Sequence, residues 1–317
     1  MGQHLTRREL LGAGLLAAEA GLAEAAPAKD ALPTRPLGKT GIQVPILGFG
    51  TAPAGIRRSL ENGAALYEEA LALGVTYFDT APSHTGYGRA QNQMGEFLKR
   101  RRKQVFLVTK CHESNGDAAL RLLEKNLKEL RTDRADLVHV HSLGDLDQAV
   151  AMGKNGVLQA LLKAKREGLT RFVGLSGHHR PGLFRQILER FDIDVVMNAV
   201  NFVDRHTYGF EEKVWPIAAR KNVALVAMKV FGGMVYRDKG MSNSMMPKDH
   251  LRQAFRYALS EPQVATAVVG MATSEELRRN VAWAKQFQPL TAEERQSLEP
   301  LGKRLAAEWG AHFGAVA

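Results

Sequence analysis

Three residues that could handle a proton each end an apolar stretch of this chain: Asp79, Lys110 and His141. If these stretches are parallel strands of one barrel, their carboxyl ends converge on one mouth, and the three side chains share a pocket. Tyr87 adds a phenol eight residues after Asp79. A phenol is a poor proton donor at neutral pH unless a cation such as Lys110 stabilises its phenolate. His139 competes with His141 for the role of the imidazole, because it lies two residues earlier in the same stretch.

The segments around these residues resemble blocks of the aldo-keto reductase family, in the family's order and over roughly residues 33 to 290. The resemblance implies an Asp79, Tyr87, Lys110 and His141 tetrad that reduces an aldehyde or ketone with NAD(P)H, or runs the reverse. His141 stands five residues after Asp136, as the family's motif requires. The matching blocks are Arg35–Val44, Leu47–Thr51, Phe78–Ala81 with Tyr87-Gly88, Val105–Lys110, Asp136–His141, Val173–Gly177, and Val269-Gly270 with Asn280.

The proton donor is where the chain departs most from the family. The family's tyrosine usually stands five residues after its acid, and that position is His84. Counted backwards from the following helix, Tyr87 has the family's spacing, which implies a three-residue insertion before it. An imidazolium can also donate a proton near neutral pH. We favour Tyr87 and keep His84 as the alternative.

The resemblance also implies a set of cofactor contacts. Two positions depart from the family: Gly177 and Ala199 stand where Asn and Gln are usual. NADP-selective members carry Arg four residues before the adenine-contacting Asn, where this chain has Glu276. Arg278 and Arg279 lie close by, so NADP is slightly favoured and NAD is possible. The expected cofactor-binding residues are Ser176, Asn198, Met228, Phe231, Gly270, Glu276 and Asn280. The helix that begins near Thr273, with a capping box to Glu276, is a suitable phosphate site.

From residue 34 onward, apolar stretches alternate with amphipathic ones at the short spacing of repeated strand–helix units. Eight predicted strands that are apolar on both faces, each followed by a predicted helix, indicate a (β/α)₈ TIM barrel. The resemblance adds an N-terminal hairpin. Residues 231–247 form a loop that could act as a lid, and 291–309 an extra C-terminal helix. The predicted strands are 45–51, 77–81, 105–110, 135–141, 171–176, 195–202, 223–229 and 265–269; the helices are 59–73, 91–101, 116–130, 155–167, 181–190, 211–221, 250–259 and 274–286.

Composition limits the classes of function. The 317 residues carry a formal charge of +10 and a single cysteine, Cys111, which excludes an internal disulfide and a cysteine-ligated cluster. No metal site is expected. The densest basic run, Lys99–Lys103, lacks interleaved aromatic residues, so we interpret it as a solvated helix end and expect no nucleic-acid partner. A small carbonyl compound is the expected substrate. A different class of function is also open, a catalytically weak nucleotide-binding regulatory subunit with the same fold.

Residues 1–28 resemble a twin-arginine export signal. Arg7 and Arg8 precede a weakly apolar stretch, and Ala26-Pro27-Ala28 is suitable for cleavage. The stretch is too short and polar to be a stable membrane anchor. The sequence thus predicts an export translocase as partner, a mature barrel of residues 29–317, and a periplasmic or otherwise exported protein. If the segment is instead a tail, the protein stays in the cytoplasm.

Overall fold

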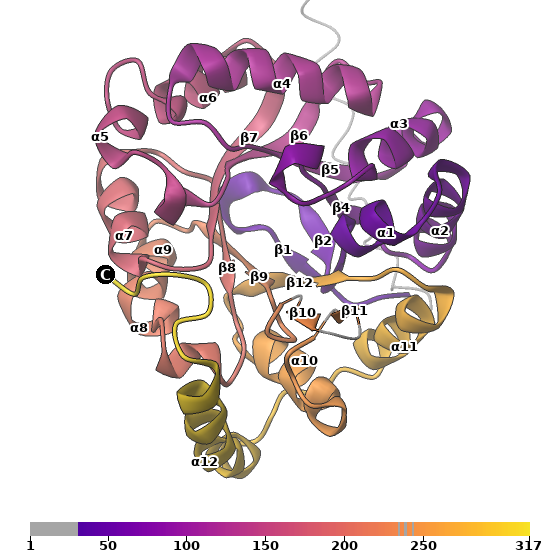
Figure 1. Ribbon diagram of the computed structural model, residues 1–317, viewed down its shortest axis with the longest axis vertical. Coiled ribbons are helices and arrows are strands. Elements are labelled where there is room, and N and C mark those ends of the chain that lie inside the picture. The colour runs from indigo at the N-terminus through magenta and orange to yellow at the C-terminus, as the bar shows by residue number, and fades with distance from the viewer. Residues whose placement is uncertain (1–30, 234, 238–239, 243) are drawn as a thin grey trace, which may run out of the picture. The chain divides into compact units, whose positions relative to one another are not determined.

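Eight parallel strands close into a barrel in the order β12-β3-β4-β5-β6-β7-β8-β9 (Figure 1). The computed structural model describes residues 31–317 apart from 234, 238–239 and 243. The predicted (β/α)₈ architecture is therefore confirmed, whereas the export signal lies outside the described residues. The barrel strands are β3 (Leu47–Gly50), β4 (Tyr77–Asp79), β5 (Phe106–Cys111), β6 (Ala135–Val140), β7 (Thr170–Gly177), β8 (Val195–Ala199), β9 (Ala224–Met228) and β12 (Val264–Gly270).

Helices surround the barrel and bury the outward-facing side of each strand (Figure 1). Several of them begin at a side-chain cap: the side-chain oxygens of Ser59, Asn115, Thr273 and Thr291 each accept a backbone N–H. None of the helices in the described part of the chain is both long and apolar enough to cross a membrane. The helices are α1 (Ala52–Arg57), α2 (Leu60–Ala72), α3 (Ala90–Arg101), α4 (Gly116–Leu130), α5 (Gln148–Ala151), α6 (Val157–Arg166), α7 (Pro181–Arg190), α8 (Phe210–Lys213), α9 (Trp215–Arg220), α10 (Leu251–Ser260), α11 (Ser274–Lys285) and α12 (Ala292–Trp309).

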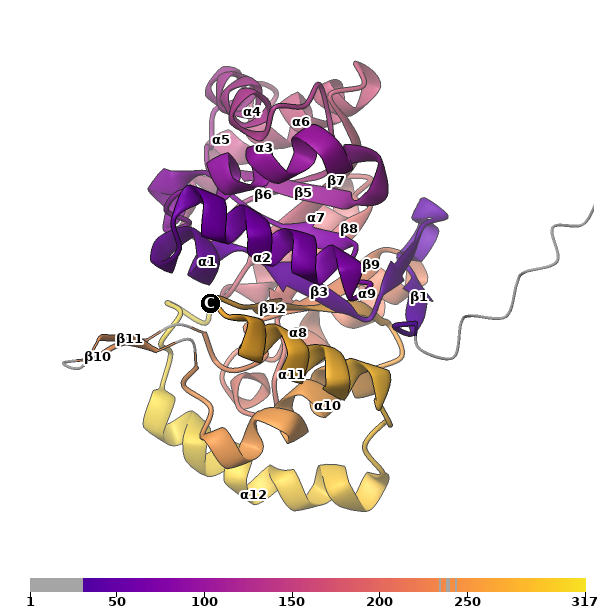
Figure 2. The ribbon, with the colours of Figure 1, turned by 90° about the vertical axis from the view of Figure 1, so that its right-hand side faces the viewer.

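The N-terminal hairpin closes one end of the barrel. β1 (Thr34–Pro36) pairs antiparallel with β2 (Gln43–Pro45), and the turn between them hydrogen-bonds from Lys39 N to Asn222 O before β9. Leu37 and Val44 are buried with the inward-facing side chains of the strands. Figure 2 shows this hairpin at one end of the barrel and the pair β10 (Val235–Arg237) and β11 (Gly240–Ser242) at the other. The open end is therefore the one at which the strands finish.

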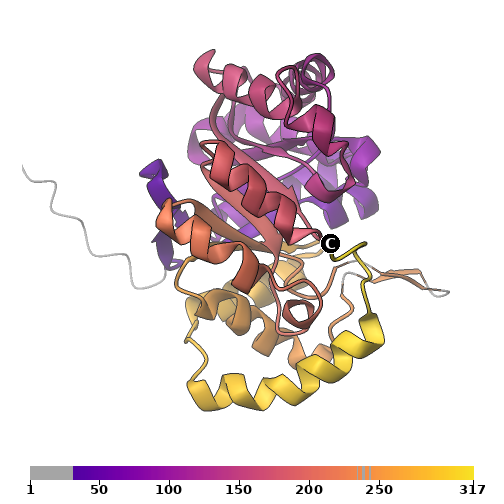
Figure 3. The same ribbon diagram turned by 90° about the vertical axis from the view of Figure 1, so that its left-hand side faces the viewer.

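The C-terminal helix and the residues after it connect the outside of the barrel to its open end (Figure 3). α12 packs on the 204–206 turn that follows β8. Beyond α12 the chain returns toward the mouth, where Tyr208 OH accepts from Phe313 N at 2.7 Å and His179 Nδ1 lies 3.1 Å from Ala315 O. The extra C-terminal helix expected from the sequence thus also delivers a tail to the mouth.

The structure differs from the predicted elements in four places. The predicted helix 211–221 is two helices, because Pro216 in the first turn of α9 cannot donate a helical hydrogen bond. The predicted strand 45–51 contains the end of β2 and the separate β3. α1 and α5 are short helices that the sequence did not predict. Within residues 231–247, β10 and β11 form a hairpin, and a lid role for this segment stays a prediction.

Candidate active site

The alternation of side chains along the strands places the predicted polar residues inside the barrel. On β4, Tyr77 belongs to the interior core, and Asp79 follows two residues later. On β5, Val108 is interior and Lys110 is again two residues on. His141 directly follows β6, in phase with the interior residue Leu137. Because successive residues of a strand point to opposite faces, all three side chains reach the open end from within.

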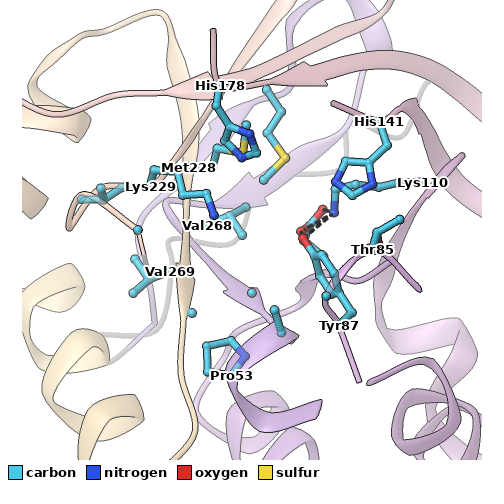
Figure 4. A pocket seen from close by; sticks show the side chains of 18 of the residues that line it. Pro53, Thr85, Tyr87, Lys110, His141, His178, Met228, Lys229, Val268 and Val269 are labelled. Carbon is cyan, nitrogen blue, oxygen red and sulfur yellow. Dashed lines mark hydrogen bonds and ion pairs between the residues drawn. The ribbon is translucent and has the colours of Figure 1, made fainter. Parts of the chain in front are cut away.

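Lys110 is the centre of a close polar cluster (Figure 4). Its Nζ lies 2.6 Å from both carboxylate oxygens of Asp79 and donates to Thr80 O at 2.9 Å. The same nitrogen is 3.2 Å from Tyr87 OH, which is itself 3.5 Å from Asp79 Oδ2. The structure thus brings the amine, the carboxylate and the phenol together at one point.

The loop after β4 carries Tyr87 to the cavity and leaves His84 outside. A short turn, Ser83–Thr85, ends at Gly86 in a left-handed conformation (φ 86°). At Gly88 (φ 56°) a Cβ would lie 2.6 Å from Gly55 O, so only glycine allows the loop to approach α1 this closely. His84 is exposed on this turn and does not line the cavity. The turn therefore brings Tyr87, and not His84, to the wall of the cavity.

Burial sets the charge states in the cluster. It raises the pKa of Asp79 and lowers the pKa of Lys110, and their mutual contact opposes both shifts. Burial, followed by the charge of Asp79, raises the pKa of Tyr87 well above its usual value. The sequence predicts that Lys110 favours the phenolate, but burial and Asp79 outweigh that effect, so the net pKa of Tyr87 is raised. The phenol therefore stays protonated at neutral and mildly alkaline pH.

His141 presents a neutral imidazole to the cavity. Burial and then the charge of Lys110 lower its pKa well below the ordinary value. Its ring meets the Tyr87 ring edge-on, with centroids 6.2 Å apart, and its Nδ1 has no protein partner among the described residues. A neutral imidazole can donate an N–H but holds no second proton.

His139 lies deeper in the barrel interior than His141. It is fully buried, and burial lowers its pKa well below the usual value. A Cβ at Gly174 would lie 2.4 Å from its Nδ1, so the glycine on the neighbouring strand provides the room that the ring needs. The structure therefore brings His141, and not His139, to the wall of the cavity.

The cluster forms one wall of a cavity of about 220 Å³ at the open end of the barrel. Met228, Phe231 and Gly270 line it, as does the backbone near Gly50. Met228 and Phe231 present apolar surface to the cavity and are 7% and 8% exposed. No group of three or more His, Cys, Asp or Glu side chains within the described ranges is arranged to hold a metal ion.

Two of the expected cofactor contacts do not reach this cavity. Asn198 has the opposite phase to the interior residue Met197, so its amide faces the helices, where it contacts Ala199 O and Trp215 Nε1. Ser176 is 1% exposed and donates to Val140 O at 3.3 Å. Neither side chain lines the cavity.

The start of α11 is organised by its capping box. Thr273 Oγ1 accepts from Glu276 N at 3.1 Å, and Glu276 Oε2 accepts from Ala272 N at 2.7 Å and Thr273 N at 3.2 Å. Arg278 pairs with Glu69 at 2.7 Å, and the Arg279 guanidinium lies 5.0 Å from the Trp283 ring centroid. The predicted cap is therefore present, but a carboxylate takes the free amide groups of this helix end.

Asn280, one turn into α11, has a fully buried side chain whose amide oxygen and nitrogen find no partner in the described part of the chain. A buried amide of this kind is costly unless a ligand completes its hydrogen bonds. This orphaned amide, with the apolar wall formed by Met228 and Phe231, fits a dinucleotide that would extend from the cavity to α11.

Two residues of the cavity were not expected from the sequence. Lys229 directly follows β9, and His178 directly follows β7; both line the cavity (Figure 4). Lys229 could have been found by the criterion that identified Lys110, because it too is a charged residue at the end of an apolar stretch. His178 lies in a His-His pair after Gly177, and nothing in the sequence distinguishes it from His179.

Comparisons with known proteins match most of this chain to one family. Residues 46–254 match the Aldo/keto reductase family. L-galactose dehydrogenase of Arabidopsis thaliana is 25% identical over 296 residues, which cover 81% of this chain and 89% of that protein. Pyridoxal 4-dehydrogenase of Microbacterium luteolum is 24% identical over 325 residues, which cover 80% of this chain and 94% of the other.

Solved structures are similar over most of their length. A putative aldo-keto reductase from Pseudomonas aeruginosa has a TM-score of 0.67 and 30% identity, over 81% of this chain and 97% of that one. The holo form of an aldo-keto reductase from Bacillus halodurans has a TM-score of 0.69 and 25% identity, over 86% of this chain and 97% of that one.

Proposed function

This chain belongs to the aldo/keto reductase family, and from that premise we propose that it is an NAD(P)H-dependent oxidoreductase that interconverts a small aldehyde or ketone and its alcohol. The observation that carries the proposal is the position of Lys110 Nζ, 2.6 Å from the Asp79 carboxylate and 3.2 Å from the Tyr87 hydroxyl on the wall of the cavity. A carbonyl oxygen that gains negative charge needs a proton donor and a stabilising dipole at that wall.

Tyr87 is the proton donor in this proposal, with Lys110 and Asp79 behind it. In reduction the phenolic O–H proton passes to the substrate oxygen, and the phenolate that results is stabilised by the Lys110 ammonium group. Asp79 holds Lys110 charged and directed at Tyr87, as its two short contacts support. His141 donates an N–H to the same substrate oxygen, because its lowered pKa keeps the imidazole neutral. His84, exposed and outside the cavity, has no role in the chemistry.

The reduced nicotinamide, when bound, supplies the hydride. Met228 and Phe231 would hold its ring by apolar contact, Gly270 leaves room for it beside β12, and the unpartnered amide of Asn280 would take the adenine. We propose NADPH as the natural form, because Arg279, whose Nε is unpartnered among the described residues, lies beside Asn280. NADH remains the alternative, because the Glu276 carboxylate at the same helix end disfavours a 2′-phosphate.

Nucleotide titration followed by a turnover screen tests the proposed function. Protein fluorescence should report binding of NADPH or NADH, and a panel of small aldehydes and ketones should show oxidation of the bound nucleotide. Binding without turnover on any carbonyl compound would contradict the proposal and favour a nucleotide-binding regulatory subunit instead.

We also propose that residues 1–28 direct export of the folded barrel through the twin-arginine translocase and are then removed. The support is in the sequence: Arg7 and Arg8, the weak apolar stretch, and Ala26-Pro27-Ala28. The protein would then act in the periplasm or outside the cell.

A further inference from the structure

A second lysine faces the cavity, on the side away from the proposed catalytic cluster. Figure 4 shows the Lys229 side chain pointing into the cavity beside His178, with Lys110, Tyr87 and His141 across from it. Unlike Lys110, Lys229 has no hydrogen bond or ion pair from its ammonium group to any residue that the structure describes. The ring of Phe313, from the C-terminal tail, lies 6.0 Å from its Nζ. This wall of the cavity therefore carries a positive charge that no carboxylate of the described residues contacts.

The backbone holds Lys229 in an unusual conformation. Its φ of 54° lies in the left-handed region, which residues with a Cβ rarely adopt. Its carbonyl accepts from Asn201 Nδ2 at 3.0 Å and from Gly232 N at 2.8 Å, and Gly232 and Gly233 also have positive φ. These bonds turn the chain at the end of β9 and direct the lysine into the cavity. Backbone strain of this kind typically persists at functional sites.

The charges around Lys229 leave it uncompensated. Among the described residues that line the cavity, Asp79 is the only carboxylate, and both of its oxygens contact Lys110. Asp204 acts on Lys229 electrostatically, but it does not line the cavity and its Oδ2 accepts from Asn201 at 2.6 Å. Burial and then the charge of Lys110 lower the pKa of Lys229, and the more distant charges of Asp79 and Asp204 oppose that shift only in part. An anion bound in the cavity would oppose it further.

We propose that Lys229, with the N–H of His178 beside it, binds a carboxylate carried by the substrate, so that the preferred substrates are small aldehydes or ketones that also bear a carboxylate. The inference rests on the proposed carbonyl reduction and names its substrate class. A charge-assisted hydrogen bond from an ammonium group is the strong contact that such a subsite needs. Lys229 and His178 line the same cavity as Lys110 and Tyr87 and lie across it from them (Figure 4), so a carboxylate bound there would lie opposite the reacting carbonyl group.

Kinetics with a matched pair of aldehydes test the subsite. The pair is 4-oxobutanoate and butanal, which share the reacting group and differ in the carboxylate. The wild-type protein should have at least a tenfold higher kcat/KM for 4-oxobutanoate. Lys229→Met should lower that value by a factor on the order of 10² and change the value for butanal less than threefold. Lys154→Met, which removes the same charge from an exposed loop, should change neither.

The same variants separate a substrate role from a cofactor role. The Kd of NADPH, from fluorescence titration, should be the same in Lys229→Met and in the wild type. A raised Kd for NADPH, an equal loss on both aldehydes, or a wild-type protein without preference between them would each overturn the proposal.

A binding measurement that needs no turnover keeps the inference distinct from the proposed function. Calorimetry should show that butanoate binds the wild-type protein saturated with NADP⁺, that butanamide does not, and that Lys229→Met loses butanoate binding. This result would support the anion subsite even if no carbonyl compound were reduced. Equal binding of butanoate to both proteins, or none to either, would overturn it.

Discussion

Lys110→Met should destabilise the protein in a way that depends on pH, because it leaves Asp79 buried without its partner. The carboxylate is 1% exposed, and removal of one member of such a pair typically costs about 3–5 kcal/mol. The cost has a ceiling, because Asp79 can take up a proton instead. Because pH 7 lies roughly three units above the ordinary pKa of Asp, and each unit corresponds to about 1.4 kcal/mol, protonation of Asp79 at pH 7 costs about 4 kcal/mol. We therefore expect a loss of about 3–4 kcal/mol in the free energy of unfolding.

The sign of the pH dependence follows from the raised pKa of Asp79 in the folded variant. Stability is lost above the unfolded-state pKa, so the deficit relative to wild type should shrink by up to about 1.4 kcal/mol per unit as the pH falls from 7 toward 4. Urea unfolding at pH 7.0 and 5.5 measures it. The control is Asp79→Asn with Lys110→Met, which removes both charges and should recover most of the stability. A deficit below about 1 kcal/mol, or one that does not change with pH, would refute the reasoning.

Turnover by Lys110→Met should fall by a factor on the order of 10² or more.

Four further predictions concern the proton donor, its pH dependence, the choice of nucleotide and export. Tyr87→Phe should lower kcat on the order of 10²-fold or more and His84→Ala by less than threefold; the reverse pattern would make His84 the acid. Because the raised pKa of Tyr87 keeps its phenol protonated, wild-type reduction should continue between pH 7 and 9, where an imidazolium donor would be lost. Glu276→Gln keeps the capping box and removes the carboxylate, so the ratio of kcat/KM for NADPH to that for NADH should rise about fivefold or more; an unchanged ratio would show that Glu276 does not face the 2′-position. Arg7→Lys with Arg8→Lys should retain an uncleaved precursor in the cytoplasm, and unchanged periplasmic recovery on immunoblots would contradict the export proposal.

The contacts of Lys110 serve both the stability of the folded protein and the proposed mechanism. The same short contacts that hold Asp79 in the interior keep the ammonium group within reach of Tyr87 OH. A variant that repairs stability by removing both charges should therefore still lack activity. The double variant used as a control thus separates a folding defect from a catalytic one.

The sequence by itself determined the barrel and the interior position of Asp79, Lys110 and His141. Alternating apolar and amphipathic stretches specify repeated strand–helix units, and a period of two along a strand fixes which residues share a face. This local rule works because strands in a closed barrel have little freedom of register once one face is buried. It also predicted the capping box at Thr273, which depends on residues only three positions apart.

Only the tertiary structure decided which side chains of the loops and strand ends reach the cavity. The sequence favours Tyr87 but leaves His84 open as the donor, and the close approach of Gly88 to Gly55 brings only Tyr87 to the cavity. Lys229 enters the cavity because distant Asn201 holds its carbonyl and the chain turns at positive φ. The charge state of Tyr87 likewise depends on its burial and on the Asp79 carboxylate, which the loop after β4 brings within 3.5 Å of its hydroxyl group. The position of each of these side chains depends on contacts between segments that are distant in the sequence. A local sequence pattern does not specify such contacts, because they form only when the whole chain packs.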